Sequence, residues 1–111
     1  MELIVKKKDR KQIKRSKRLV IPPHLAEKLV KTTESLGREY YRSLSIEIKQ
    51  VYAYIYEGEG PLCRLKYLGK DDEWGFAIFK YSSMTFSTNE FMFPTKGTMH
   101  DLIEVALTAY S

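Results

Sequence analysis

The sequence predicts one α+β domain, in which two N-terminal helices precede a three-stranded antiparallel meander and a C-terminal covering helix. Apolar residues recur every three or four positions in the first half, alternate over residues 62–93, and return to helical spacing near the C-terminus. A chain of 111 residues with 43% hydrophobic side chains can build one core. We therefore divide it into a basic arm, residues 1–18, and a single domain, residues 19–111.

The first helix is expected over about residues 23–36. Leu25, Leu29 and Leu36 share one helical face. Gly37 then offers two interpretations: it either stops this helix or is a tolerated glycine inside one longer helix, at a cost of about 1 kcal/mol relative to alanine.

The segment 38–55 fits two patterns. The spacing of a helical seam is met by Tyr41, Leu44, Ile48, Val51 and Ile55. However, Tyr52, Tyr54 and Tyr56 alternate with apolar residues, which is typical of a strand. The helical pattern covers more of the window, so we predict a helix over 38–55 and keep a strand as the alternative for 46–56.

The second half predicts a meander. Residues 62–68 and 74–81 read as an antiparallel hairpin around a polar turn at 69–73. A less regular third strand is expected over residues 86–93.

The last helix has the clearest pattern. Its apolar face is formed by Met99, Ile103, Ala106, Leu107 and Tyr110. Thr98 is the expected N-cap. We predict that Trp74, Phe76 or Ile78 packs beneath this helix against Ile103 and Leu107.

The excess positive charge lies at the N-terminus. The chain carries a net charge of +5, yet residues 1–18 hold nine basic and only two acidic side chains. The basic residues of this arm are Lys6, Lys7, Lys8, Arg10, Lys11, Lys14, Arg15, Lys17 and Arg18. Such a segment favours contact with the phosphates of nucleic acid, or it is a solvated tail that only aids solubility.

Chemistry-bearing residues are few. His24 and His100 lie near predicted helix starts without a sequence-placed partner, and Cys63 falls on the inward face of a strand. The acids at 71–73 suit a solvated turn better than a cation site. We therefore expect no enzyme, no catalytic residue, no cofactor and no metal site. One cysteine and no membrane-length apolar run favour a cytoplasmic protein without membrane contact.

Two segments resemble known nucleic-acid-binding families. Residues 17–55 place a basic strand, a helix, Gly37 and a second helix in the order that resembles a ribbon-helix-helix DNA-binding module. That resemblance implies a homodimer in which paired segments 17–21 enter the major groove. Residues 74–81 are similar to the aromatic strand of RNA-recognition and cold-shock domains, where bases stack on exposed rings, but core packing is the favoured explanation of those aromatics.

These observations lead to two hypotheses. The first is a small non-enzymatic nucleic-acid-binding accessory or regulatory protein that uses the basic arm. The alternative is a protein-interaction or assembly module that dimerises through its helical half.

Overall fold

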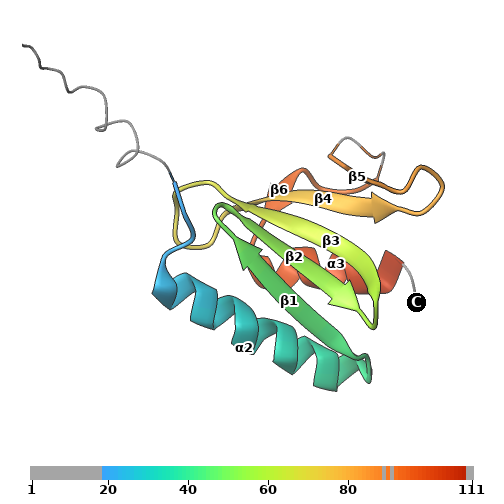
Figure 1. Cartoon of the computed structure of the whole chain (residues 1–111), viewed down its shortest axis with the longest axis horizontal. Helices are drawn as coiled ribbons and strands as arrows, with labels where there is room; N and C mark the ends of the chain where they lie inside the picture. Colours follow the sequence, from blue (N-terminus) through green and yellow to red (C-terminus); the bar gives the residue numbers. More distant parts are fainter. Residues whose placement is uncertain (1–18, 89, 91, 110–111) are drawn as a thin grey trace, which may run out of the picture.

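The computed structural model describes residues 19–88, 90 and 92–109. It contains two helices, α2 (Pro23–Tyr40) and α3 (Met99–Ala109), which precede and follow the strands along the chain (Figure 1). The strands are β1 (Leu44–Lys49), β2 (Tyr52–Glu57), β3 (Gly60–Tyr67), β4 (Trp74–Lys80), β5 (Thr85–Ser87) and β6 (Lys96–Gly97).

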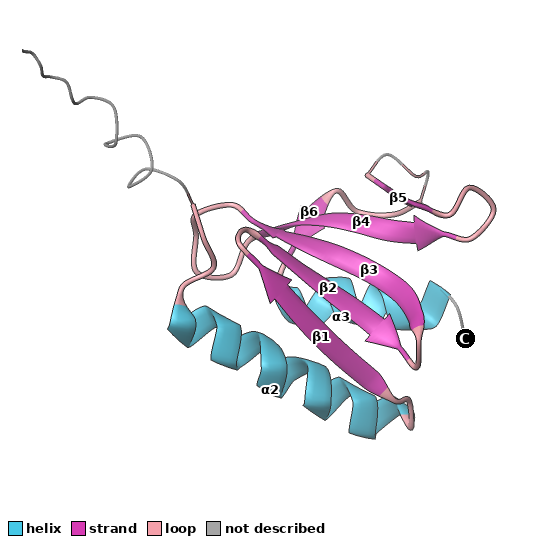
Figure 2. Ribbon diagram, in the orientation of Figure 1, coloured by secondary structure: helices cyan, strands magenta, loops and turns pink. Residues whose placement is uncertain are grey.

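The strands form one antiparallel sheet in the order β1-β2-β3-β4-β5 (Figure 2). Strand β6 also pairs with β4, so β5 and β6 share one edge of that strand. Strand β5 pairs with residues 78–80 and β6 with residues 74–75. In the part of the chain that the structure describes, no strand pairs with residues 76–77 on this edge.

Both helices pack against the same face of the sheet. In Figure 1, α3 passes behind the strands, while α2 runs alongside β1. The core between the layers combines apolar residues of α2, α3 and β2–β4. Its members are Ile21, Leu25, Leu29, Leu36, Ala53, Ile55, Leu62, Cys63, Leu65, Trp74, Phe76, Ile78, Met99, Leu102, Ile103, Ala106 and Leu107.

The predicted α+β class is correct, but the second N-terminal helix is wrong. Residues 44–57 form the hairpin of β1 and β2, so one helix precedes a sheet of six strands rather than a three-stranded meander. Gln50 adopts a left-handed conformation at φ 55° and turns the chain between the two strands. Leu44, Ile46 and Ile48 then point toward the helices, as alternation requires.

The first helix is longer than expected because Gly37 lies inside it. Helix α2 continues to Tyr40 and ends at Tyr41, whose φ of 56° is left-handed. The chain then folds back, and the Arg42 amide donates to the Gly37 carbonyl at 2.8 Å. A Cβ on Gly37 would lie 2.9 Å from the Arg42 carbonyl oxygen, so this close return requires glycine.

Other predictions for the second half are confirmed. Strands β3 and β4 form the expected hairpin, and the third strand is present but shorter than predicted. The Asp101 amide donates to Thr98 Oγ1 at 3.2 Å, which is the expected N-cap of α3. Trp74 lies in the same core as Ile103 and Leu107.

Two polar contacts hold the layers together. Asp72 Oδ1 in the β3–β4 turn accepts hydrogen bonds from Trp74 Nε1 at 3.2 Å and from the Met99 amide at 3.0 Å. Arg42, which follows α2, forms a bidentate ion pair with Glu57, the last residue of β2. The turn at Asp72 is therefore tied to the start of α3.

Candidate functional site

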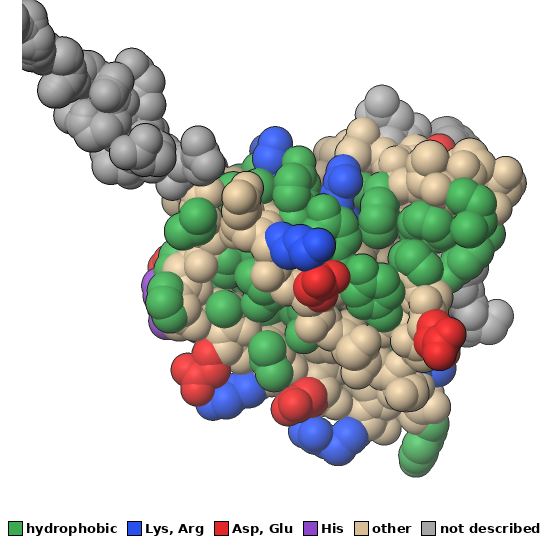
Figure 3. Space-filling view, viewed as in Figure 1, with side chains coloured by type: hydrophobic (Ala, Val, Ile, Leu, Met, Phe, Trp, Pro, Cys, Tyr) green, Lys and Arg blue, Asp and Glu red, His purple; other side chains and the backbone are tan. Residues whose placement is uncertain are grey.

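The sheet face turned away from the helices is rich in aromatic and basic side chains. Because successive side chains of a strand point to opposite faces, this face carries the residues that alternate with the core-facing ones. These residues are Ser45, Glu47, Lys49, Tyr52, Tyr54, Tyr56, Arg64, Lys66, Gly75, Ala77, Phe79 and Phe86. Figure 3 shows apolar and tyrosine side chains gathered over the strands, with Lys and Arg side chains among them. We call this surface the open face.

Aromatic rings form a connected set on the open face. The ring centroids of Tyr52 and Tyr54 are 6.0 Å apart, and those of Tyr54 and Phe86 are 5.7 Å apart. Phe86 in turn meets Phe79 edge-on at 5.1 Å. Tyr54 and Phe86 meet across β3 and β4 because Ala77, which lies between them in the sheet, has only a methyl group.

Arg64 lies at the centre of this set. Its guanidinium carbon lies 4.6 Å from the Tyr52 ring centroid and 5.1 Å from that of Phe86. Both distances are within the range of a cation–π contact. Among the residues that the structure describes, neither Arg64 nor the exposed Lys66 forms an ion pair with a carboxylate. The open face thus presents two cations whose charge no described acid neutralises.

One row across the sheet concentrates lysines. Cross-strand pairing aligns Lys49, Tyr52, Lys66, Gly75 and Lys96, which we call the basic row. Two of its lysines are partly neutralised, by Glu47 at 3.6 Å and by Glu73 at 3.2 Å. Hydrogen bonds from Lys70 and Lys96 lower the pKa of Glu73 below its ordinary value.

The basic arm joins the domain at this same end of the sheet. Leu19, the first described residue, lies near Gly69 in the β3–β4 turn. Its Cδ1 atom is 3.9 Å from the position that a Cβ on Gly69 would occupy. The Ile21 amide donates to the Gln50 carbonyl in the β1–β2 turn at 2.9 Å. Both turns border the basic row, so the described chain begins at the end of the sheet where this row lies.

A hollow of about 220 Å³ opens on the open face beside Arg64. Its lining residues are Arg64, Lys66, Gly75, Phe76, Ala77, Thr88 and Thr95. A second hollow, of about 700 Å³, is a wide depression beside the C-terminal end of α2. The second hollow is lined by Arg38 and also by Glu34, and its Arg42 is engaged by Glu57.

The nine predicted binding residues Lys6, Lys7, Lys8, Arg10, Lys11, Lys14, Arg15, Lys17 and Arg18 lie outside the described residues. The ribbon-helix-helix interpretation does not survive in the described part: residues 19–21 form no strand, and the second helix is replaced by β1 and β2. Residues 74–81 do include a strand, yet Trp74 and Phe76 face the core and Phe79 is only 6% exposed. Tyr81 is exposed but lies beyond the end of β4, and the rings of Tyr52, Tyr54 and Tyr56 on β2 are half-buried.

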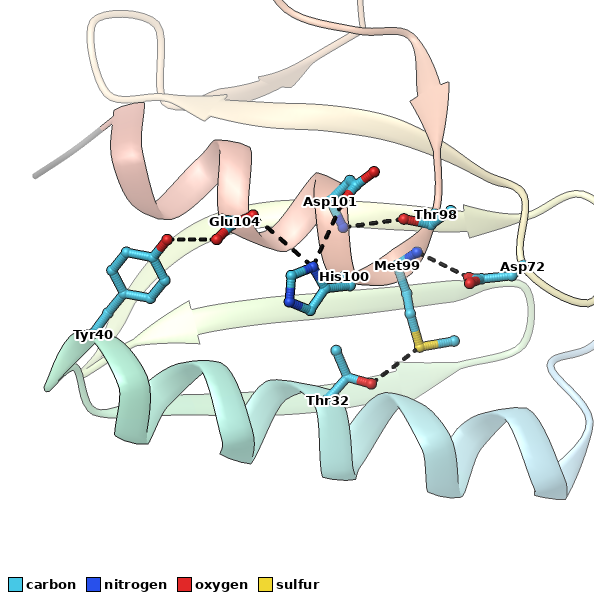
Figure 4. Close-up of polar contacts among 8 residues, drawn as sticks. All are labelled: Thr32, Tyr40, Asp72, Thr98, Met99, His100, Asp101 and Glu104. Atoms are coloured by element: carbon cyan, nitrogen blue, oxygen red, sulfur yellow. Dashed lines mark hydrogen bonds and ion pairs between the residues drawn. The ribbon is translucent and has the colours of Figure 1, made fainter.

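The two histidines are not brought together in a hollow. His24 is exposed near the start of α2, and His100 is exposed near the start of α3. His100 Nδ1 lies 3.5 Å from Asp101 and 3.9 Å from a Glu104 oxygen (Figure 4). Glu104 also accepts a hydrogen bond from the Tyr40 hydroxyl at 2.6 Å, which raises the pKa of Tyr40 to about 12.

The atoms of His100, Asp101 and Glu104 that could bind a metal lie within 4.8 Å of one another. They belong to one turn of α3, and two of the three side chains are exposed. This arrangement is that of a surface ion-pair cluster.

Cys63 and the acids of the β3–β4 turn have structural roles. Cys63 is fully buried, as predicted, and burial raises the pKa of its thiol, which disfavours the reactive thiolate. Asp71 is exposed, as a solvated turn predicts. Asp72 departs from that prediction because it is half-buried and accepts the two hydrogen bonds described above.

Sequence reasoning missed the open face as a site. Its signal is the alternation of three tyrosines, Tyr52, Tyr54 and Tyr56, and of Arg64 with Lys66 on the following strand. The pairing of Tyr54 with Arg64 and of Tyr52 with Lys66 becomes visible only with the register of β2 and β3.

Comparisons with protein-family models, with curated proteins and with solved structures each found no match for this chain. Within the described residues, neither helix is both long and apolar enough to cross a membrane. The functional argument therefore rests on the geometry and charge of the open face and on the composition of the arm.

Proposed function

We propose that this protein is a non-enzymatic nucleic-acid-binding accessory or regulatory protein. One observation carries the proposal: on a sheet face that no described element covers, Arg64 lies between the rings of Tyr52 and Phe86, and no described carboxylate pairs with it. Nucleic acid offers both chemistries that such a surface selects, because phosphates attract the cation and bases stack on the rings.

The surroundings of Arg64 support a polyanion rather than a single small anion. Lys66 lies two residues further along β3 on the same face and is exposed. The arm 1–18 holds nine basic residues, and it precedes Leu19, which lies near the β3–β4 turn. A ligand with regularly repeated phosphates can contact the open face and the arm together, which a monovalent anion cannot do.

In this proposal, the arm and the open face make different contributions to binding affinity. The arm contributes sequence-independent attraction that falls steeply with salt. The rings of the open face contribute contacts with bases, which depend little on salt. The two contributions are therefore separable by titration at several ionic strengths.

Fluorescence anisotropy with labelled single strands and duplexes, at three salt concentrations, tests the proposal. Neutralising the arm at Lys6, Lys7, Lys8, Arg10 and Lys11 should flatten the slope of log affinity against log salt. The expected change is up to about 0.9 per lost contact on duplex DNA and about 0.7 on a single strand. Arg64→Gln should weaken single-strand binding by more than the loss of one ionic contact, because it also disturbs the ring set.

Lys28→Gln is the matched control, since Lys28 is an exposed cation on α2, away from the open face. It should change neither affinity nor salt dependence beyond the small effect of net charge. Wild-type binding weaker than about 10⁻⁴ M at low salt would refute the proposal, because even non-specific binding is usually tighter. A stable dimer under those conditions would then favour the assembly-module hypothesis.

A further inference from the structure

The hollow beside Arg64 exists because two successive open-face positions of β4 have almost no side chain. Gly75 has none, and Ala77 has a single methyl group. On the outer edge of β4, β5 ends at Ser87 and β6 begins at Lys96, so none of the described strands stands next to Phe76 and Ala77. The Phe76 amide is satisfied instead by the Thr95 carbonyl at 2.9 Å.

The size of the hollow limits what it can hold. Its volume of about 220 Å³ is smaller than the 300–1,000 Å³ that drug-sized ligands usually occupy. It suits one planar ring system rather than a whole cofactor. Its floor is formed by the backbone and small side chains of β4, while Arg64 and Lys66 border it on β3 and Thr88 and Thr95 line it from the other side.

The lining combines groups that a base and its flanking phosphates require. The floor offers contact mainly at Gly75, because Ala77 is only 1% exposed, so it suits the edge of a ring, and threonine hydroxyls can donate to or accept from the polar atoms of that ring. The cations of Arg64 and Lys66 lie where the phosphates on either side of such a base would pass. Tyr52 and Tyr54 stand on the next strand, in register with Lys66 and Arg64, and can stack the neighbouring bases.

We propose that the hollow over Gly75 and Ala77 takes one unpaired base of a single-stranded nucleic acid whose adjacent bases stack on Tyr52 and Tyr54. This inference rests on the proposed function and adds its ligand class. Bases inside a duplex are paired and stacked, so they cannot enter the hollow without being extruded. The open face therefore selects single strands, whereas the arm binds the phosphates of both forms.

Filling the hollow tests this inference. Gly75→Val places a branched side chain over the floor at a strand position with no left-handed φ, so the substitution is compatible with β4. A Cβ there would meet Lys66 Cβ at 3.4 Å, so a small adjustment accommodates it. Ser45→Val is the matched control, because Ser45 lies on the same face but on β1, three strands from Gly75.

Single-strand affinity of Gly75→Val should fall about tenfold, while its duplex affinity and its salt slope stay within about twofold of wild type. Ser45→Val should match wild type on both ligands. An abasic single strand of equal length and charge makes the test specific. Wild type and Gly75→Val should bind the abasic strand equally, because it lacks the base that the hollow would take.

Near-ultraviolet circular dichroism of Trp74, which is buried and precedes Gly75 on β4, checks that the variants are folded. If Gly75→Val fails to fold, Gly75→Ala and Thr95→Val replace it, and each should weaken only the binding of base-containing single strands. Equal affinity of wild type and variants for the normal single strand would overturn the inference and leave the proposed function standing. Absence of any nucleic-acid binding by wild type would overturn both the inference and the proposed function. If, in that case, wild type were a dimer and Gly75→Val dissociated it, the open face would be assigned to contact with a second copy of the chain.

Discussion

Replacing Asp72 by alanine removes the only carboxylate shown to join the β3–β4 turn to α3 in the described part of the chain. Two hydrogen bonds to an ionised acceptor are lost, one from Trp74 Nε1 and one from the Met99 amide. Trp74 is 0% exposed and Met99 is 1% exposed, so water replaces the lost acceptor poorly. A bond to a charged group contributes about 1.5–3 kcal/mol, and an abandoned buried donor costs about 1–3 kcal/mol. Because these terms overlap, we expect a net loss of about 2–4 kcal/mol.

Urea unfolding followed by tryptophan fluorescence measures this loss directly, because Trp74 is the single tryptophan of the chain. With a slope of about 1–3 kcal/mol per molar urea, the midpoint should fall by about 1–2 M. Asp72→Asn retains an oxygen acceptor and should lose only about 1 kcal/mol. Asp71→Ala is the matched control and should remain within about 0.5 kcal/mol of wild type. If Asp72→Ala behaved like Asp71→Ala, the turn would not be anchoring the helix.

Three further outcomes follow from burial and charge. Leu107 is fully buried beneath the sheet, so Leu107→Ala should cost about 2–5 kcal/mol in denaturant unfolding, and a cost below about 1 kcal/mol would mean that α3 does not cover the sheet. The hydrogen bonds from Arg42 lower the pKa of Glu57, so this pair stabilises the fold above the unfolded-state pKa of about 4.3, and the contribution is lost as the pH falls through the folded-state pKa. Glu57→Gln should accordingly destabilise at pH 7 and differ little from wild type at pH 3, and equal losses at both pH values would contradict this assignment. Cys63 should react with a thiol reagent only after unfolding, and rapid labelling of the native protein would show that the core opens locally.

The mistaken helix over residues 38–55 shows where sequence patterns mislead. Within a strand, alternate inward residues are two or four positions apart, as Leu44 and Ile48 are. After the turn at Gln50, the inward-facing positions are offset by an odd number of residues from those of the first strand. Val51 therefore has the inward phase of the second strand although it comes three positions after Ile48. Two alternating strands joined in this way reproduce the spacing of a helical seam. Gln50 has a left-handed φ without being glycine or asparagine, so the sequence gives no turn signal there.

The terminal elements were predictable because their signals are local. Thr98 as N-cap and the apolar face of α3 can be read from a few neighbouring residues. The open face is different, because its members come from five strands whose register depends on a bulge and on the turns. The contact between Tyr54 and Phe86 joins residues 32 positions apart over a small Ala77, and no sequence period encodes it.

Helices α2 and α3 are the first and last elements of the described fold, and they pack on each other through groups 64 and 67 residues apart. Closing a loop of that length costs about 4 kcal/mol in chain entropy, whereas the hairpins of β1–β4 each close short loops. We therefore expect the meander to pair early in folding and α3 to dock late. In a chevron measurement, Leu107→Ala should then accelerate unfolding much more than it slows refolding. A mainly slowed refolding arm would instead place the helix pair in the folding nucleus. The same ordering means that thermal fluctuation releases α3 before it opens the sheet.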